Sequence, residues 1–246
     1  MKLTERIYLV GGGQLGISHD YDCHVYLVDG GGELALIDSG AGEETEQIIS
    51  NIEGEGYDPG QVGKVFLTHA HADHIGGARS LKEELGSELC ALEGAAALIE
   101  GGDEEELGLK MAKRSGVYAP DYRYPHVPVD RGLRDGETVK LGDISIEVIH
   151  VPGHSEFSTC YGFKRDGYSA LFSGDVVLFQ GEIGLLNCPG SSLKGYREHF
   201  HKLAERNFQG LFPGHKLFVL YGGQESIDLA EERLTKLAVP PTFFNE

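Results

Sequence analysis

Residues 68–77 read T-H-A-H-A-D-H-I-G-G. Within six positions this stretch holds four side chains that can bind a metal: His69, His71, Asp73 and His74. An apolar run, V-F-L at residues 65–67, precedes it, and a helix-like pattern follows it. Three imidazoles and a carboxylate so close together fit a divalent metal that prefers nitrogen and oxygen ligands, and zinc is the first expectation.

Three more polar residues stand in a matching sequence context. Each follows an apolar run and lies in a turn marked by glycine or proline: His154 in V-P-G-H-S, Asp175 in F-S-G-D and His215 in F-P-G-H. A turn after a strand places a side chain at the edge of a sheet, where functional loops concentrate. These residues are therefore further candidates for the same metal site.

The apolar periodicity predicts two groups of strands accompanied by helices. The strands expected in the first half are residues 7–10, 24–28, 34–37, 62–67 and 88–92, and those in the second half are residues 138–141, 144–150, 159–163, 169–172 and 210–212. The expected helices are residues 43–54, 75–85, two pieces within 94–116, 193–206 and 225–237. This order indicates two sheets with outer helices in a single domain spanning residues 1–246.

The four motifs, T-H-A-H-A-D-H and then P-G-H-S, S-G-D and P-G-H, together resemble the metallo-β-lactamase superfamily. The resemblance covers the chain from about residue 3 to 215. It implies an α/β fold, a four-layer αβ/βα sandwich of two mixed sheets flanked by helices. It also implies how the ligands divide: His69, His71 and His154 on a first metal, Asp73, His74 and His215 on a second, and Asp175 bridging the two.

The residues at positions 175 and 71 distinguish the branches of the superfamily that this chain could resemble. Position 175 is Asp, whereas the β-lactamase branches typically carry Cys there, so the ligand set is closer to the glyoxalase II-like, lactonase-like and phosphodiesterase-like branches. Position 71 is His, whereas the flavodiiron branch usually carries Glu, which favours hydrolysis over reduction of oxygen or nitric oxide.

The leading interpretation is a binuclear metal-dependent hydrolase that uses a metal-bridging hydroxide on a small ester, thioester or lactone. Two divalent ions are expected as cofactors, zinc first, with iron or manganese as alternatives. Asp73 is the expected catalytic residue, because its carboxylate can orient the hydroxide and move its proton. Asp38 is the candidate carboxylate partner of a ligand histidine, with a turn or cap residue as the competing interpretation.

Three other functions stay open. One is a phosphodiesterase or nuclease of the same superfamily, another is β-lactamase-type amide hydrolysis as a weak activity, and the third is a non-catalytic metal-binding scaffold. A glyoxalase II-like thioesterase is one form of the leading hypothesis. The segment after His215 carries sparse basic residues, Arg233 and Lys236 among them, which argues against glutathione as the specific substrate.

The charge and composition of the chain limit the kinds of binding partner that can be expected. The net charge is −18, from 39 acidic and 21 basic residues, which disfavours nucleic acid and anionic membrane surfaces. A small-molecule substrate is therefore expected, and no apolar run approaches the roughly 18 residues of a transmembrane helix. Four scattered cysteines without a C-x-x-C pair favour a reducing compartment, and we expect a cytoplasmic protein. The sequence gives no signal for an oligomeric state.

Substrate contacts are expected from three residues: Tyr118, Asn187 and Tyr221. Tyr118 shares a loop with Tyr122 and Tyr124, between the two groups of strands, where it can cap the metal site. Asn187 follows the Asp175 turn, and Tyr221 comes six residues after His215. The competing interpretation is that these side chains cover the core or lie in surface turns.

Overall fold

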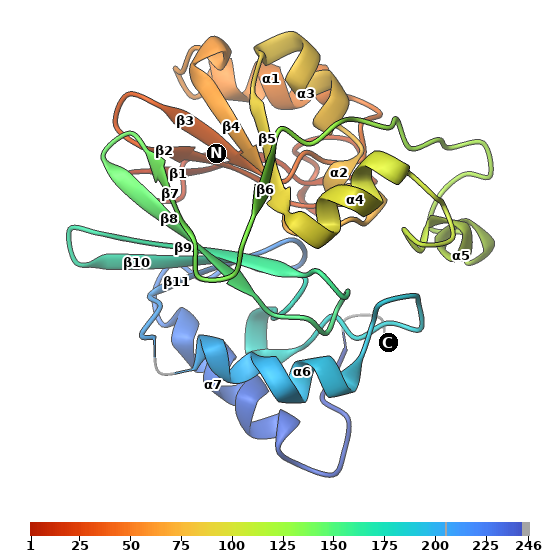
Figure 1. The fold of residues 1–246 in the computed structure, drawn as a ribbon. Helices are drawn as coiled ribbons and strands as arrows, with labels where there is room; N and C mark the ends of the chain where they lie inside the picture. The colour runs from red at the N-terminus through yellow and green to blue at the C-terminus, as the bar shows by residue number, and fades with distance from the viewer. Residues whose placement is uncertain (205, 243–246) are drawn as a thin grey trace. The chain divides into compact units, whose positions relative to one another are not determined.

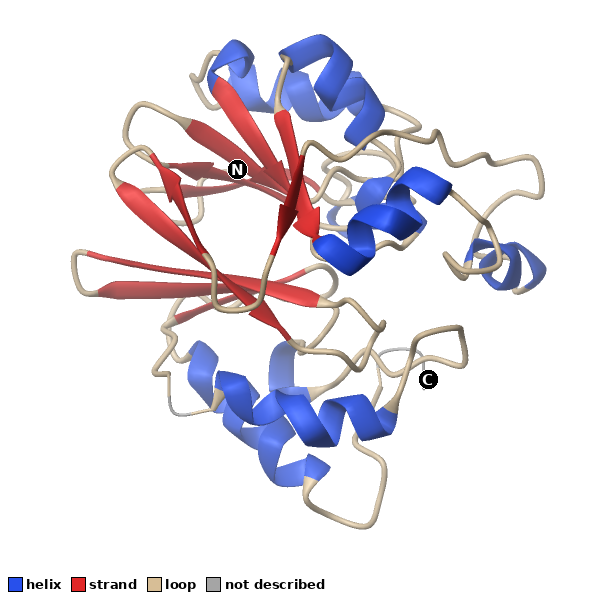
Figure 2. Ribbon diagram, in the orientation of Figure 1, coloured by secondary structure: helices blue, strands red, loops and turns tan. Residues whose placement is uncertain are grey.

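Two β-sheets, each in its own unit of the chain, organise the computed structural model, which describes residues 1–204 and 206–242. The first unit is Met1–Leu133 together with Leu141–Asp143, and the second is Arg134–Lys140 together with the chain from Ile144 onward. In each unit the strands form one sheet and helices pack against it (Figures 1 and 2).

The first sheet has six strands in sequence order: β1 (Ile7–Gly11), β2 (Val25–Asp29), β3 (Leu34–Ile37), β4 (Val62–Phe66), β5 (Glu88–Leu92) and β6 (Arg131–Leu133). β1, β2 and β3 pair antiparallel, and β3 to β6 pair parallel. β2 and β3 form a hairpin. Gly31 and Gly32 adopt φ values of 79° and 112°, which residues with a β-carbon rarely adopt.

Helices of the first unit pack against the ends and faces of this sheet. α1 (Thr45–Gly54) contacts β1, α3 (Ala78–Leu85) contacts β4 and β5, and α4 (Glu93–Gly101) contacts β5 and β6. α1 buries Ile48 and Ile52, the apolar positions whose spacing predicted it. α5 (Leu109–Arg114) is short and precedes the tyrosine-rich loop.

One helix prediction in this unit was wrong in its bounds. Instead of a continuous helix over residues 75–85, the chain forms α2 (Ala72–Ile75) and then α3, separated by Gly76 and Gly77. The loop of residues 39–41 passes so close that a β-carbon on Gly76 or Gly77 would lie 2.1 Å from a backbone oxygen of Ala41 or Ser39. This close approach interrupts the helix, and it places Asp73 and His74 within α2.

The second sheet has five strands in the order β11-β10-β9-β8-β7. They are β7 (Thr138–Leu141), β8 (Ile144–His150), β9 (Thr159–Arg165), β10 (Tyr168–Gly174) and β11 (Gly210–Pro213). β8 and β10 each pair antiparallel with β9, and β10 pairs parallel with β11. β8, β10 and β11 therefore run in the same direction, and their carboxyl ends meet at one edge.

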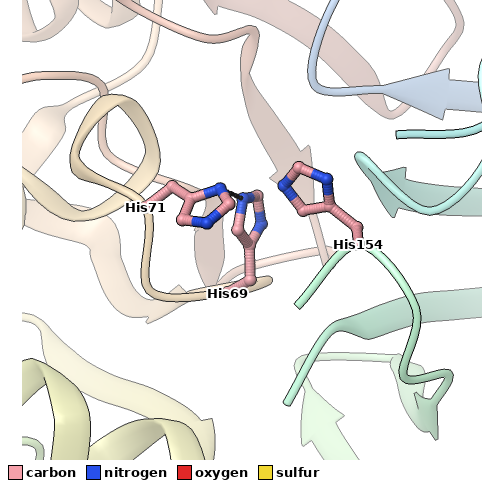
Figure 3. A group of neighbouring side chains, drawn as sticks. All are labelled: His69, His71 and His154. Carbon is pink, nitrogen blue, oxygen red and sulfur yellow. Dashed lines mark hydrogen bonds between the residues drawn. The ribbon is translucent and has the colours of Figure 1, made fainter. Parts of the chain in front are cut away.

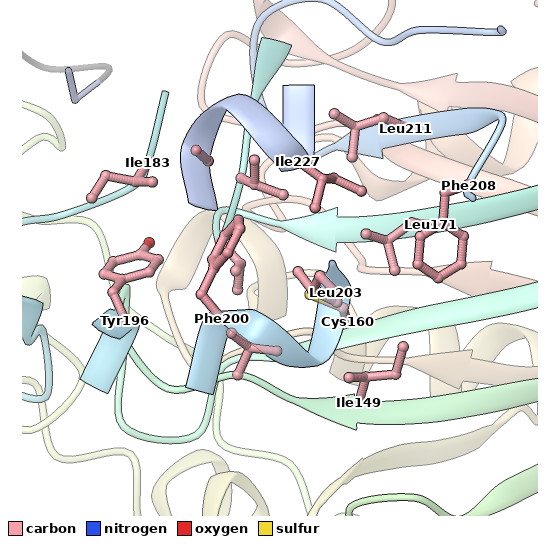
Figure 4. Packing of buried hydrophobic residues seen from close by; sticks show 14 of the residues in the cluster. Ile149, Cys160, Leu171, Ile183, Tyr196, Phe200, Leu203, Phe208, Leu211 and Ile227 are labelled. Carbon is pink, nitrogen blue, oxygen red and sulfur yellow. The ribbon is translucent and has the colours of Figure 1, made fainter. Parts of the chain in front are cut away.

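Two helices, α6 (Leu193–His199) and α7 (Gly223–Leu234), close the core of the second unit (Figure 4). Phe200, Leu203 and Ile227 are fully buried there against strand residues such as Leu171 and Leu211. The predicted helix over residues 193–206 was too long, because α6 ends at His199 and a 3-10 turn, Phe200–Leu203, follows it. That turn directs both Phe200 and Leu203 into the core.

All ten predicted strands are confirmed with small shifts in their bounds, and among the described residues the apolar pattern missed one named strand, β6. β6 has three residues, R-G-L, too short for a periodic signal. Three of the four cysteines are buried and all four are free thiols, as expected for small core residues. Within residues 1–204 and 206–242, no helix has the length and apolar character needed to cross a membrane.

The core of the second unit gives a stability prediction. Ile227→Ala should lower the free energy of unfolding by about 2–5 kcal/mol, because the side chain is fully buried on α7 and its loss leaves a cavity. Urea denaturation measures the change. The control is Leu237→Ala, at a residue that is 99% exposed, and this substitution should change stability by less than about 0.5 kcal/mol. Equal effects in the two variants would contradict this packing.

Candidate metal centre

In the first unit, the chain leaves β4 at Phe66 and enters α2 at Ala72, so the four candidate ligands lie in a short loop and one helical turn. His69 and His74 are buried, with ring centroids 4.0 Å apart. His69 Nε2 lies 3.1 Å from His71 Nδ1, the contact dashed in Figure 3. His74 Nε2 lies 3.5 Å from Asp73 Oδ2. The structure thus brings together all four candidates of this segment.

Asp38 holds His74 in place. β3 ends at Ile37, and because β3 and β4 are parallel, Asp38 and Thr68 emerge at the same edge of the sheet. Asp38 is buried and accepts hydrogen bonds from the Thr68 backbone N–H (2.8 Å) and hydroxyl (2.9 Å). Its Oδ2 lies 2.8 Å from His74 Nδ1. The predicted contact between Asp38 and a histidine is confirmed, and it places the His74 proton on Nδ1 and the lone pair on Nε2.

In the second unit, the three candidates follow β8, β10 and β11, the strands whose carboxyl ends share an edge. Asp175 Oδ2 lies 3.6 Å from His154 Nε2 and 3.5 Å from His215 Nε2. His154 and Asp175 are buried, and the His215 side chain is 13% exposed. One carboxylate oxygen is thus approached by two imidazole nitrogens. Figure 3 also labels His154, which belongs to this unit.

A backbone carbonyl orients His154. Its Nδ1 lies 2.5 Å from the carbonyl oxygen of Gly184, which can only accept a hydrogen bond. The His154 lone pair is therefore on Nε2, the nitrogen directed toward Asp175. Sequence reasoning missed Gly184, because a backbone carbonyl that orients a side chain has no signature of its own in the sequence.

The spacing of these donors fits metal ligation. Two ligand atoms about 2.1 Å from one ion at a tetrahedral angle are about 3.4 Å apart. The His–Asp separations of 3.5, 3.6 and 3.5 Å match this value and exceed an ordinary hydrogen-bond length. Imidazole nitrogen and carboxylate oxygen are donors that zinc, iron and manganese accept. Both donor sets could therefore hold divalent metal ions.

Cys23 lies beside the first donor set, but its chemistry disfavours a role as a metal ligand. Its sulfur, an Asp38 oxygen and a His74 nitrogen all lie within 4.8 Å of one another. Burial raises the pKa of the Cys23 thiol well above its usual range, which disfavours the thiolate that binds metals. We interpret Cys23 as a packing residue, because it is fully buried.

The hydroxyl groups of the three tyrosines in the predicted substrate loop have different hydrogen-bond partners. Tyr122 donates its hydroxyl to the Ala41 carbonyl at 2.8 Å, and Tyr124 donates to the Ile99 carbonyl at 3.1 Å, so both are tied to the backbone. Tyr118 is buried, and its hydroxyl hydrogen-bonds the Asp73 carboxylate. Burial, and then the charge of Asp73, raises the pKa of Tyr118, so its hydroxyl remains a donor.

The other two predicted substrate residues lie on the surface of the second unit. Asn187 is exposed, and Tyr221 is 76% exposed with its ring against that of Tyr168. Their contact with a substrate stays a prediction. A residue that the sequence reasoning did not single out is Tyr21, whose ring centroid lies 5.1 Å from that of Tyr118 and whose hydroxyl accepts a hydrogen bond from the Ala119 N–H.

Comparison with known proteins adds independent evidence. Residues 20–223 match the family model of the metallo-beta-lactamase superfamily. The chain is 30% identical over 230 residues to acyl-coenzyme A thioesterase MBLAC2 of Gallus gallus, a match that covers 88% of this chain and 79% of the relative. It is 34% identical over 161 residues to the hydroxyacylglutathione hydrolase GloC of Haemophilus influenzae, covering 63% and 66% of the two chains.

Solved structures agree with this assignment. The subclass B3 metallo-beta-lactamase BJP-1 of Bradyrhizobium japonicum superposes with a TM-score of 0.73 at 25% identity, over 94% of this chain and 89% of that one. The predicted fold class, an α/β fold with two mixed sheets flanked by helices, is confirmed, as is the resemblance that carried it. The chain belongs to the metallo-β-lactamase superfamily and is a metal-dependent hydrolase.

Proposed function

We propose that the two donor sets form one binuclear metal site that hydrolyses a small acyl thioester. The first metal would be held by His69, His71 and His154, the second by Asp73, His74 and His215, and Asp175 would bridge them. This proposal treats residues 1–246 as one functional domain. The proposal rests on the position of Asp175 Oδ2, which lies 3.6 Å from His154 Nε2 and 3.5 Å from His215 Nε2. These two histidines are assigned to different metals.

When bound, two divalent ions supply an activated water and polarise the carbonyl of the substrate. The chain prepares the ligands for this role, because Asp38 and the Gly184 carbonyl fix the tautomers of His74 and His154. Asp73 is the proposed catalytic residue: its carboxylate orients the attacking water and accepts its proton. The Tyr118 hydroxyl, hydrogen-bonded to Asp73, holds that carboxylate in position.

Three observations support a thioester over other substrates. The relative from Gallus gallus is named as an acyl-coenzyme A thioesterase, and the relative from Haemophilus influenzae is named as a hydroxyacylglutathione hydrolase. Asp stands at position 175, where the resemblance implies Cys in typical β-lactamases. The net charge of −18 also disfavours a nuclease, because backbone recognition of nucleic acid depends on clustered Lys and Arg.

Metal analysis tests the bridging role of Asp175. The purified protein, loaded with zinc, should hold two ions per chain by elemental analysis and should hydrolyse acyl thioesters in preference to lactones, β-lactams and phosphodiesters. Asp175→Ala should lose metal from both positions and lose turnover by orders of magnitude, because it removes the shared ligand. The control Asp228→Ala lies on the exposed face of α7 and should retain both. Unchanged metal content in Asp175→Ala would contradict the proposal.

A second test addresses Asp38. Asparagine keeps the side-chain shape and tolerates the φ of 63° found at this position, but it has one accepting oxygen instead of two, so it cannot accept all three hydrogen bonds that Asp38 accepts from Thr68 and His74. Asp38→Asn should lower the free energy of unfolding by about 1–3 kcal/mol. It should also weaken zinc binding by about 10–100-fold in a chelator competition.

The matched control is Asp166→Asn, another aspartate at positive φ (52°), whose side chain is 77% exposed. It should change the unfolding free energy by less than about 0.5 kcal/mol and leave zinc affinity unaltered. If Asp38→Asn binds zinc as tightly as Asp166→Asn, Asp38 does not orient a metal ligand.

Steady-state kinetics tests Tyr118. Tyr118→Phe keeps the ring that stacks on Tyr122 but removes the hydroxyl donated to Asp73. We expect kcat on a thioester to fall about tenfold, the effect of one hydrogen bond to a charged group, with little change in KM. Tyr124→Phe, which removes a hydroxyl bound to the Ile99 carbonyl, is the control and should keep its kcat. A rise in KM alone would instead assign Tyr118 to substrate binding.

A further inference from the structure

Tyr196 on α6 connects the backbone segments that carry the ligands of the second unit. The residue is fully buried beside Phe200, in a cluster of otherwise apolar side chains (Figure 4). Its hydroxyl donates to the Asp175 carbonyl at 3.3 Å and accepts from the Gly184 N–H at 3.1 Å. A buried hydroxyl without hydrogen bonds is costly, so these two bonds are what makes a tyrosine tolerable at this place.

The two backbone groups that Tyr196 binds lie directly behind the ligands. The Gly184 carbonyl lies 2.5 Å from His154 Nδ1, and the N–H of the same residue donates to the Tyr196 hydroxyl. Gly184 therefore connects Tyr196 to His154 by one hydrogen bond on its N–H side and one on its carbonyl side. At Asp175, the carbonyl that accepts the hydroxyl belongs to the same residue whose Oδ2 faces both His154 and His215. One phenol oxygen therefore connects to both sides of the 3.6 Å contact between His154 Nε2 and Asp175 Oδ2.

The ring of Tyr196 fixes the third segment. A β-carbon on Gly153, the residue before His154, would lie 2.5–2.7 Å from three atoms of this ring. Gly153 also adopts a φ of 159°, at the limit of what residues with a β-carbon reach. The P-G-H turn therefore lies directly on the tyrosine ring. Gly184 is held as tightly, because a β-carbon there would lie 2.2 Å from the Asp175 carbonyl oxygen and 2.6 Å from His154 Nδ1.

We propose that Tyr196 is a positioning residue of the metal centre, which sets the separation of His154 and Asp175 by holding Gly153, Asp175 and Gly184 around one side chain. The inference rests on the proposed metal site. Tyr196 touches neither metal nor substrate in this role. It acts through the backbone of the ligands, so its loss should alter how tightly metal is held before it alters the chemistry itself.

The test is Tyr196→Phe, which keeps the ring against Gly153 and removes only the hydroxyl. Zinc affinity and release are measured by competition with a chromogenic chelator, at a temperature at which circular dichroism shows the variant folded. We expect the zinc dissociation constant to rise about tenfold, the lower range for removal of an outer partner of a ligand. Excess zinc should restore most of the thioesterase activity. Tyr124→Phe, the control, should lower thermal stability without changing zinc release.

The outcomes separate the two proposals. Zinc release from Tyr196→Phe equal to that of the unmodified protein overturns the positioning role and leaves the proposed function standing. An unmodified protein that takes up no zinc overturns the proposed function itself.

If Tyr196→Phe does not fold, hydrogen exchange of the unmodified protein replaces it. The Gly184 N–H donates to Tyr196 and the Gly184 carbonyl binds the ligand His154, so zinc binding at His154 should slow hydrogen exchange in the peptide that contains Gly184. The same exchange rate with and without zinc overturns the inference.

Discussion

Parallel strand pairing is the constraint on which the candidate metal centre depends. β3 and β4 in the first unit, and β10 and β11 in the second, are parallel neighbours, so each pair delivers two chain segments to the same edge of its sheet. The residue just after each strand can then meet its neighbour, as Asp38 meets Thr68 and His74. The sheets need no unusual side chains for this. Short turns rich in glycine and proline after apolar strands are sufficient to place polar groups at a rigid edge.

The two units orient their ligand histidines with different hydrogen-bond acceptors. An imidazole binds a metal through the nitrogen without a proton, so the other nitrogen must donate to a fixed acceptor. For His74 the acceptor is a buried carboxylate, Asp38, and for His154 it is the main-chain carbonyl of Gly184. A carbonyl is only as well placed as its loop, and in the second unit the Gly184 N–H donates to the buried Tyr196 hydroxyl, the contact on which the proposed positioning role rests.

The sequence predicted the parts of this site that depend on local pattern. Strand ends, the seven candidate ligands and Asp38 all follow from apolar runs that stop at a turn. It did not predict what depends on distant chain segments. The break at Gly76 and Gly77 arises because residues 39–41 pass close by, and Tyr118 differs from Tyr122 and Tyr124 only in what its hydroxyl meets. Tyr196 lies in an ordinary helical pattern, and nothing in that pattern indicates its hydrogen bonds to Asp175 and Gly184.

Position 38 shows how narrow the choice of amino acid becomes when two unrelated demands coincide. The backbone there has a φ of 63°, which glycine, asparagine and aspartate accept most readily. The surrounding donors, two from Thr68 and one from His74, call for a carboxylate on a short side chain. Glycine meets only the first demand, and glutamate has the carboxylate but carries it on a side chain that is one methylene too long. Among the twenty residues, aspartate alone satisfies both, so a redesign that altered this turn would have to rebuild the histidine's partner elsewhere.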